Sequence, residues 1–469
     1  MKQISWQGFD PTVLKACRVV QTLVSENGGK AHLVGGCVRD LLLGRTPKDI
    51  DIEVFGIGPS ELKGLLAGEF ALDVVGEAFG VIKLHELPID VSLPRRESKR
   101  GLGHRGFEIF SDPSMSPQDA ASRRDFTVNA MALDMESGAL LDFYGGQADL
   151  QSKTLTHVSD QFAEDPLRVL RGLQFAGRLG LTAGPETIQL CKNLKPEYAT
   201  LAIERIWAEW NKWATQSEEP AKGLAFLREC EWVDLYPELS ALSGCPQDPE
   251  YHPEGDVWTH TLLVVDQAAR IAQREELAQD DRAILVLSAL CHDLGKPRTT
   301  EMKGQRVSSY GHTSTIDLFQ SFLGRIGAPA HLVNRVVVLC QYHLTHIDFV
   351  QSARHVRRVA VALEKAGESL VMLSRLVEAD HSGRPPLPAE LPDKMAAMLV
   401  MAKELSVQDT GPRPLLLGRH ILQLGLKPGP QIGEILKEAF EAQLEGQLQT
   451  EEEALVWAKS RVELVTQSP

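Results

Sequence analysis

Residues 35–56 read GGCVRDLLLGRTPKDIDIEVFG and combine a glycine pair, an arginine and three alternating acidic residues. Asp49, Asp51 and Glu53 alternate with apolar residues, which is the pattern of a strand with one polar face. The two aspartates would then project the same way, roughly 7 Å apart along the strand. Two such carboxylates can hold a hard divalent cation such as Mg²⁺. A solvated edge strand has the same pattern, so the motif alone leaves both interpretations open.

The residues before this strand favour an anion-binding site. AHLVGG predicts a buried strand and VRDLLLG a short helix, so Gly35 and Gly36 let backbone amides approach an anion. Arg39 lies one turn into the helix, and its forked guanidinium suits phosphate. The alternative is a tight turn in which Arg39 pairs with an acid such as Asp40. The stretch is neither a Walker loop nor a GxGxxG fingerprint.

A third carboxylate on a neighbouring strand would complete a site for two metal ions. Asp90, in LPIDVSLP, is the candidate. Glu53 lies a further step along its strand, so we do not expect it to be a ligand. The sequence therefore predicts Asp49, Asp51 and Asp90 as the catalytic carboxylates, with Asp49 and Asp51 binding Mg²⁺.

The composition is that of a globular protein, with 43% hydrophobic and 24% charged residues in a chain of 469. A net charge of −14 argues against broad non-specific binding to nucleic acid, although it leaves room for a local basic site. The segment 95–106 is basic and glycine-rich, which predicts a mobile loop. No membrane span or signal peptide is evident, and seven scattered cysteines favour a cytoplasmic location.

The pattern of apolar residues predicts an α+β region followed by helices. Short strands alternate with helices up to about residue 150, and the remainder is helical, apart from a Gly/Pro-rich linker at 243–256 and a proline-rich break at 383–394. We expect four regions: a head, a helical neck, a second helical domain and a helical tail, at residues 1–155, 156–245, 246–390 and 391–469.

Two later segments carry polar groups suited to a nucleotide. SRRDFTVNAMALD contains Arg124 and Asp125, and EDPLRVLR contains Asp165, Arg168 and Arg171. On a helix, Asp165 and Arg168 would face one way, as an acceptor and a forked donor for a nucleobase edge. The alternative is a surface ion pair worth a few tenths of a kcal/mol.

The segments GGCVRDLLLG, DID, RRDFTVNAMALD and EDPLRVLRGLQFAGRLG, in this order and spacing, resemble the class II tRNA nucleotidyltransferase and bacterial poly(A) polymerase family. The resemblance implies a head with a DNA-polymerase-β-like palm, followed by all-α neck, body and tail regions. It also implies roles in nucleotide binding for Gly35, Gly36, Arg39, Arg124, Asp125, Asp165, Arg168 and Arg171. Gln174 departs from the family, whose members often carry arginine there, and segment 95–106 occupies the place of the family's flexible loop.

A second set of residues lies in the later helical block. His260, His292-Asp293 and Asp380 resemble the HD phosphohydrolase superfamily, in which imidazoles and carboxylates converge on a divalent metal that activates water. His312 and His343 are candidates to line the same pocket. YHPEGDVWTHTLLVVDQAA and the tail resemble the HD-bearing bacterial CCA-adding subgroup, in which the HD domain is linked to phosphatase and 2′,3′-cyclic phosphodiesterase action.

The sequence thus predicts an enzyme that adds CCA to tRNA 3′ ends from CTP and ATP, with Mg²⁺ and a second divalent metal in the HD domain. An A-adding enzyme or a poly(A) polymerase is the nearest alternative. A different class is an HD phosphohydrolase whose head only binds RNA, and the third is a non-catalytic RNA-binding protein.

Overall fold

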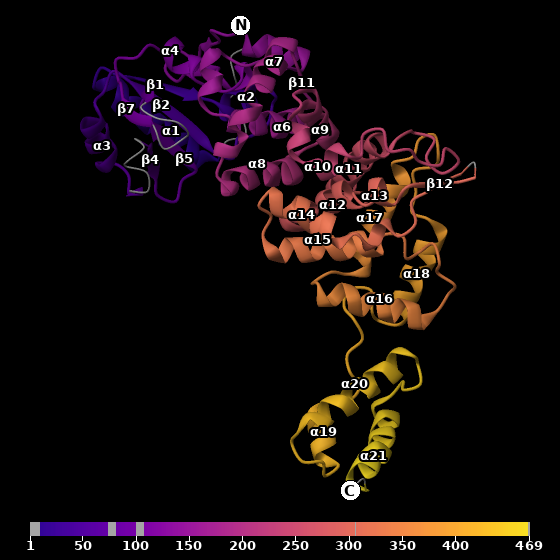
Figure 1. Ribbon diagram of the computed structural model, residues 1–469. Helices are drawn as coiled ribbons and strands as arrows, with labels where there is room; N and C mark the ends of the chain where they lie inside the picture. Colours follow the sequence, from indigo (N-terminus) through magenta and orange to yellow (C-terminus); the bar gives the residue numbers. More distant parts are fainter. Residues whose placement is uncertain (1–9, 74–80, 100–106, 305, 468–469) are drawn as a thin grey trace. The chain divides into compact units, whose positions relative to one another are not determined.

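The computed structural model describes residues 10–73, 81–99, 107–304 and 306–467 (Figure 1), and they divide into two compact units, 1–233 and 234–469. The α+β head followed by helices that the sequence predicts is confirmed. The finer division into four regions stays a prediction. No helix within the described ranges is both long and apolar enough to cross a membrane.

The first unit is built on a seven-stranded mixed sheet formed by the described residues. The strands, in spatial order, are β3 (Leu72–Asp73), β4 (Val81–Leu84), β5 (Ile89–Ser92), β2 (Ile50–Phe55), β1 (Lys30–Val34), β8 (Ala132–Asp134) and β9 (Leu140–Leu141). The alternation of β2 is real, since Ile50, Ile52 and Val54 are buried in the core. Because β2 and β5 pair in parallel with Asp51 opposite Asp90, the two carboxylates share one face.

Helices cover the sheet and continue beyond it. The N-terminal helix α1 (Pro11–Glu26) starts where the Asp10 side chain accepts a hydrogen bond from the Thr12 amide at 2.8 Å, and it packs on β1 and α3. The other helices of this unit are α2 (Gly36–Leu42), α3 (Pro59–Ala67), α4 (Pro117–Ser122), α5 (Gly146–Ser152), α6 (Leu167–Leu179), α7 (Pro185–Asn193), α8 (Ile203–Gln216) and α9 (Pro220–Glu229).

Glycines let α6, α8 and α9 pack closely. A Cβ on Gly223 of α9 would lie 2.4 Å from the Leu173 carbonyl of α6, and a Cβ on Gly172 would lie 2.6 Å from the Phe226 ring. Neither position has room for a side chain. This close packing gives α6, which carries the EDPLR segment at its start, a fixed position.

The prediction of a loop over 95–106 is wrong in its first part. Residues Arg95–Lys99 form strand β6, which pairs antiparallel with β7 (Phe107–Ser111) in a separate two-stranded sheet. The sequence FEIFS is rich in residues with high β-propensity and gives the basic segment a partner. Residues 100–106, the centre of the predicted loop, lie outside the described residues.

The second unit is helical. Its helices are α10 (Pro237–Ser240), α11 (Val257–Arg274), α12 (Gln279–Cys291), α13 (Lys296–Thr299), α14 (Ile316–Arg325), α15 (Ala330–Tyr342), α16 (Ala353–Lys365), α17 (Leu370–Ser382), α18 (Asp393–Glu404), α19 (Gly418–Gln423), α20 (Pro430–Leu444) and α21 (Glu451–Gln467). A hairpin of β12 (Glu301–Lys303) and β13 (Arg306–Ser308) interrupts them. The α11, α12 and α17 helices pack against one another, which brings residues more than 100 positions apart together.

Candidate functional site

The three predicted carboxylates, Asp49, Asp51 and Asp90, line a cavity of about 500 Å³ in the head. The other lining residues are Asp73, Lys83, Leu84, Glu86, Leu87 and Pro88. Asp49 lies one residue before β2 and is exposed, whereas Asp51 lies within the strand. Burial raises the pKa of Asp51, and the like charges of Asp90 and Asp49 add to this although Arg124 opposes it. A divalent cation would relieve this repulsion, so the residues present fit a metal.

The Asp90 carboxylate forms an ion pair with Lys83. Lys83 of β4 donates to both oxygens of Asp90, at 3.0 and 2.8 Å. Asp90 lies beside Asp51 on the neighbouring strand, as predicted. Its role as a metal ligand stays a prediction. Glu53 instead lies 3.9 Å from the Arg124 guanidinium, outside the set that lines the cavity.

The glycine pair opens the site at the start of α2. Gly35 has φ 75°, and a Cβ there would lie 2.7 Å from Arg124 Nη1 and 3.7 Å from Asp51 Oδ2. The positive φ favours glycine at position 35, and the end of the Arg124 side chain would have to move to admit a Cβ there. At Gly36 the contact is looser, since a Cβ would lie 3.4 Å from Arg39 Nη2.

Arg39 is buried, and its three guanidinium nitrogens all donate hydrogen bonds. Its Nε and Nη2 donate to Asp40 Oδ1 at 2.9 and 2.8 Å, and its Nη1 donates to Asn129 Oδ1 at 2.6 Å. The pairing with Asp40 that the sequence left open is thus present. The Asp40 carboxylate offsets the charge of Arg39, while the neutral Asn129 holds the other side of the guanidinium.

A chain of hydrogen bonds links the RRDFT segment to α6. Asp125 is buried and accepts from the Phe126 amide at 2.8 Å, Asn129 Nδ2 at 3.1 Å and Arg171 Nε at 2.6 Å. Burial raises the pKa of Asp125, but Arg171 and Asn129 outweigh it, so the pKa lies below its usual range. The carboxylate therefore stays ionised and holds the Arg171 guanidinium in place.

Three guanidiniums surround the Phe175 ring of α6. Arg39, Arg171 and Arg178 lie 5.5, 5.3 and 5.9 Å from its centroid. Arg178 also donates to Gln174 Oε1 at 3.2 Å, and burial with nearby Arg39 lowers its pKa to about 10. This group, which we call the arginine cluster, concentrates positive charge in an acidic chain.

The EDPLR segment differs from the prediction at its second residue, Asp165. Asp165 has extended backbone and precedes α6, so it does not share a helix face with Arg168. Its Oδ1 accepts from the Leu167 amide at 3.1 Å and its Oδ2 from Arg205 at 2.8 Å. The physical reason is Pro166, which disfavours helical backbone at the residue before it. Arg168 donates to backbone carbonyls of Gln161 and Arg123, each at 2.7 Å.

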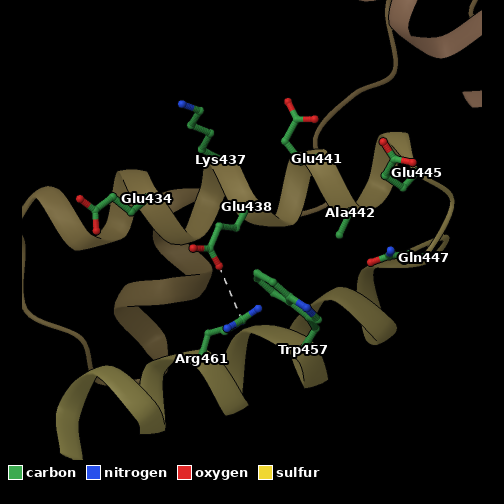
Figure 2. A pocket seen from close by; sticks show the side chains of 9 residues that line it. All are labelled: Glu434, Lys437, Glu438, Glu441, Ala442, Glu445, Gln447, Trp457 and Arg461. Atoms are coloured by element: carbon green, nitrogen blue, oxygen red, sulfur yellow. Dashed lines mark ion pairs between the residues drawn. The ribbon is translucent and has the colours of Figure 1, made fainter. Parts of the chain in front are cut away.

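A second, larger hollow lies in the tail. A groove of about 600 Å³ between α20 and α21 is lined by Glu434, Lys437, Glu438, Glu441, Ala442, Glu445, Gln447, Trp457 and Arg461 (Figure 2). Arg461 lies 3.6 Å from Glu438 and over the Trp457 ring, 5.1 Å from its centroid. Four carboxylates face two cations here, so the groove is unfavourable for a phosphate backbone.

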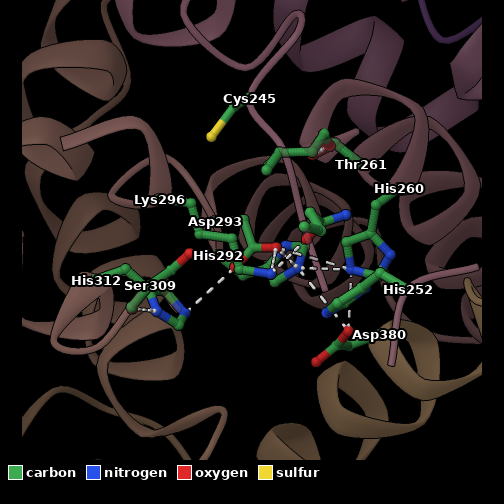
Figure 3. A network of polar contacts seen from close by, with 12 residues as sticks. Cys245, His252, His260, Thr261, His292, Asp293, Lys296, Ser309, His312 and Asp380 are labelled. Atoms are coloured by element: carbon green, nitrogen blue, oxygen red, sulfur yellow. Dashed lines mark hydrogen bonds and ion pairs between the residues drawn. The ribbon is translucent and has the colours of Figure 1, made fainter. Parts of the chain in front are cut away.

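The predicted HD residues converge in the second unit, deep among α11, α12 and α17 (Figure 3). His260 Nε2 lies 3.1 Å from Asp380 Oδ1, 3.3 Å from His292 Nε2 and 3.8 Å from Asp293 Oδ2. His312 Nε2 lies 3.3 Å from Asp293 Oδ1, and the His343 ring packs 5.2 Å from that of His292. We call these six residues the histidine–aspartate cluster. It includes His312 and His343, which the sequence offered as candidates to line the pocket.

The hydrogen bonds around the cluster leave its ligand atoms pointing inward. Nδ1 of His292, His312 and His343 each donates to a backbone carbonyl, at 2.8, 2.7 and 2.7 Å. Each Nε2 then has a lone pair that can bind a metal. Asp293 Oδ1 and His312 Nε2 are buried with no hydrogen-bond partner among the described residues, and Asp293 Oδ2 faces the Lys296 ammonium at 2.7 Å. A cation between Oδ1 and the imidazoles would satisfy the first two atoms, so the cluster fits a divalent metal.

Burial and neighbouring charges shift the pKa values of the histidines in the cluster in opposite directions. Burial lowers the pKa of His260, but the carboxylates of Asp380 and Glu254 outweigh it and raise the pKa to about 9. Burial and the neighbouring His292 and His312 lower the pKa of His343 to about 3. Lys296 donates to Gln247 Oε1 and lies 2.7 Å from Asp293 Oδ2, which places another positive charge at this aspartate.

Comparison with known proteins supports both halves of this description. Residues 31–156 match the Poly A polymerase head domain, and residues 257–348 match the HD domain. A multifunctional CCA protein of Vibrio parahaemolyticus is 36% identical over 382 residues, which cover 80% of this chain and 90% of that protein. The chain belongs to the multifunctional CCA protein family. A relative from Hahella chejuensis is 38% identical over 322 residues, covering 67% and 72% of the two chains.

Solved structures of CCA-adding enzymes share the fold. The Bacillus stearothermophilus enzyme in complex with CTP has a TM-score of 0.65 at 21% identity, over 98% of this chain and 100% of that one. The Thermotoga maritima enzyme complexed with tRNA_CCA has a TM-score of 0.59 at 20% identity, over 97% of each chain. The predicted resemblance and the fold that it implies are therefore confirmed.

Sequence reasoning missed several residues of this CCA-family chain. His252 and Glu254 were assigned to a linker, but Glu254 Oε1 lies 2.9 Å from His252 Nδ1 and 2.8 Å from His260 Nδ1. An acid six residues before a predicted metal ligand was a usable signal. Arg205, which holds Asp165, had no local signal because the two are 40 positions apart.

The Asp125–Arg171 pair predicts a measurable stability loss. Arg171→Ala should lower the free energy of unfolding by about 2 kcal/mol at neutral pH, because it leaves a buried carboxylate without its cation. The pKa of Asp125 is lower in the folded chain than in the unfolded chain, where it is about 4. The pair therefore stabilises the folded state fully above pH about 4. Its contribution is lost as the pH falls through the folded pKa. Urea unfolding at neutral and acidic pH measures the free energy of unfolding, and Lys222→Ala, at an exposed position, is the control. If both variants lose the same stability, the Asp125–Arg171 pair does not stabilise the fold as predicted.

Proposed function

We propose that the chain adds cytidine, cytidine and adenosine to the 3′ end of tRNA, using CTP and ATP. The observation that carries the proposal is the register that sets Asp51 beside Asp90 at a cavity also lined by Asp49. Family membership supports the substrate, because the relatives are multifunctional CCA proteins and similar folds are CCA-adding enzymes complexed with CTP and with tRNA. Seven free, buried cysteines support a cytoplasmic location.

In the proposed reaction the terminal 3′-hydroxyl attacks the α-phosphorus of the nucleotide, a new P–O bond forms, and pyrophosphate leaves. Mg²⁺ held by Asp49 and Asp51, with Asp90, would lower the pKa of the hydroxyl and balance charge on the leaving group. Gly35 and Gly36 leave space for the phosphates beside Arg124 and Arg39. These groups orient the substrate and stabilise developing charge.

Base selection is assigned to Asp165 and Arg168, with Arg124 and Asp125 at the ribose and Arg171 as a further contact. Arg205 fixes the Asp165 carboxylate, and the carbonyls of Gln161 and Arg123 hold the Arg168 guanidinium. Fixed donors and acceptors of this kind favour cytosine and adenine edges by hydrogen bonding without a nucleic-acid template.

A nucleotide-selectivity assay tests the activity. Purified protein is given tRNA lacking CCA, with CTP alone, ATP alone, or both, and products are resolved by length. We expect two additions with CTP alone and three with both nucleotides. Addition of AMP only to tRNA ending in CC would indicate an A-adding enzyme, and long A-tails would indicate a poly(A) polymerase.

The histidine–aspartate cluster supports a second function, a metal-dependent phosphohydrolase. Its imidazole nitrogens and carboxylates suit a divalent transition metal, which would supply an activated water when bound. Asp293 lies between His260 and His292 on one side and His312 on the other, so it can contribute to two adjacent metal positions. If only this activity is found, the head is an RNA-binding module, and if neither is found, the chain is a binding protein.

A further inference from the structure

The loop before α11 sends a carboxylate into the second unit. Glu254 has a side chain only 1% exposed, and its Oε1 accepts from His252 Nδ1 at 2.9 Å. The same oxygen lies 2.8 Å from His260 Nδ1 in an ion pair. Its second oxygen, Oε2, is buried without a hydrogen-bond partner among the described residues. Burying a carboxylate costs free energy unless charged partners offset it, and two imidazoles are those partners here.

This contact fixes which nitrogen of His260 faces the cluster. A carboxylate oxygen only accepts hydrogen bonds, so its contact with a ring nitrogen at 2.8 Å requires a proton on that nitrogen. His260 Nδ1 therefore carries the proton. The ring is oriented with Nε2 toward Asp380, His292 and Asp293, at 3.1, 3.3 and 3.8 Å.

His260 differs in this respect from three other histidines of the cluster. His292, His312 and His343 use backbone carbonyls at Nδ1, whereas His260 uses a buried carboxylate. A carboxylate behind a ligating imidazole orients the ring and makes the opposite nitrogen a stronger ligand than a carbonyl does. The His252 ring packs edge-on against His260, with centroids 4.7 Å apart, and covers it on one side (Figure 3).

We propose that Glu254 is a positioning residue of the metal centre, acting through His260, with His252 holding the carboxylate in place. The inference rests on the metal site proposed above and adds the loop 247–254 to it. It assigns a role to a segment whose composition alone predicts a linker.

Cobalt binding to the full chain tests the proposal. Co²⁺ is titrated into metal-free protein carrying Asp51→Asn, which removes the head site, and bound ion is followed by visible absorption. We expect Glu254→Ala to weaken binding about 10- to 100-fold. Glu254→Gln should weaken it less, about threefold or more, because the amide oxygen can still accept from Nδ1. Glu250→Gln, in the same loop but 62% exposed, should bind as the parent does.

Two readouts separate positioning from a structural role. The melting temperature of the metal-free variants reports folding, and if Glu254→Ala does not fold, Glu254→Gln carries the test. At a pH above the pKa of His260, where the imidazole is neutral, nitrogen-15 spectra of labelled histidines should place the His260 proton on Nδ1 in the parent and show a tautomer mixture in Glu254→Ala.

The outcomes distinguish this inference from the site on which it rests. If His292→Ala loses cobalt while both Glu254 variants bind it as the parent does, Glu254 has no positioning role and the metal site stands. If the parent binds no cobalt, or binds it as well as His292→Ala, both proposals are wrong.

Discussion

Asp51→Asn is expected to abolish nucleotide addition while leaving the chain folded. Asp51 lies within β2, pairs in register with Asp90, and has a pKa raised by burial and by its acidic neighbours, so it is the carboxylate most in need of a cation. Loss of one preorganised group that contacts developing charge costs about 10²- to 10³-fold in rate, and a metal ligand should exceed this. We expect a loss of kcat of about 10³-fold or more, measured by CMP addition to tRNA lacking CCA.

The matched control is Asp73→Asn, which lines the same cavity but whose carboxylate pairs with His85 at 2.8 Å. It should retain near-parental activity. Nucleotide binding by Asp51→Asn should also survive, because the arginine cluster is unaltered. Retention of more than a tenth of the parental rate by Asp51→Asn would show that the metal assignment is wrong.

Asp293→Asn is expected to separate the two proposed activities. Asp293 Oδ2 contacts His292 at 3.2 Å and Lys296 at 2.7 Å, while Oδ1 faces His312 at 3.3 Å, so its charge lies at the middle of the cluster. Without it, hydrolysis of a 2′,3′-cyclic nucleotide in the presence of a divalent transition metal should fall by about 10²-fold or more. CCA addition should remain, because its carboxylates belong to the other compact unit.

Asp281→Asn provides the control, since Asp281 lies on α12, is 40% exposed and pairs with Arg335 at 2.8 Å. It should keep both activities. If Asp293→Asn hydrolyses the substrate at the parental rate, the histidine–aspartate cluster is not the hydrolytic site.

Periodicity predicted the parts of the site that lie on regular elements. The alternation of Ile50, Ile52 and Val54 predicted the polar face of β2. The helical pattern of the later block predicted α11, which carries His260, and α12, which ends one residue before His292. These are local patterns, and the burial of their apolar residues sets the direction of the polar ones.

Sequence periodicity does not predict the contacts made by loops or between segments far apart in the chain. Glu254 belongs to a stretch rich in glycine and proline, where composition indicates a turn but not the direction of a side chain. The i, i+3 spacing of Asp165 and Arg168 predicts a shared helix face, but Pro166 keeps Asp165 in extended backbone before α6. The choice of Arg39 between Asp40 and a phosphate depends on three-dimensional neighbours such as Asn129, which is 90 positions away.

The arginine cluster has a consequence for how a substrate is received. Three guanidiniums lie 5.3 to 5.9 Å from the centroid of the buried Phe175 ring. Two of them, Arg39 and Arg171, are held by the carboxylates of Asp40 and Asp125. Folding has thus already restricted the freedom of these side chains before a substrate arrives. In the proposed reaction an incoming triphosphate would meet donors that are already ordered, in one small region of a chain whose overall charge is −14.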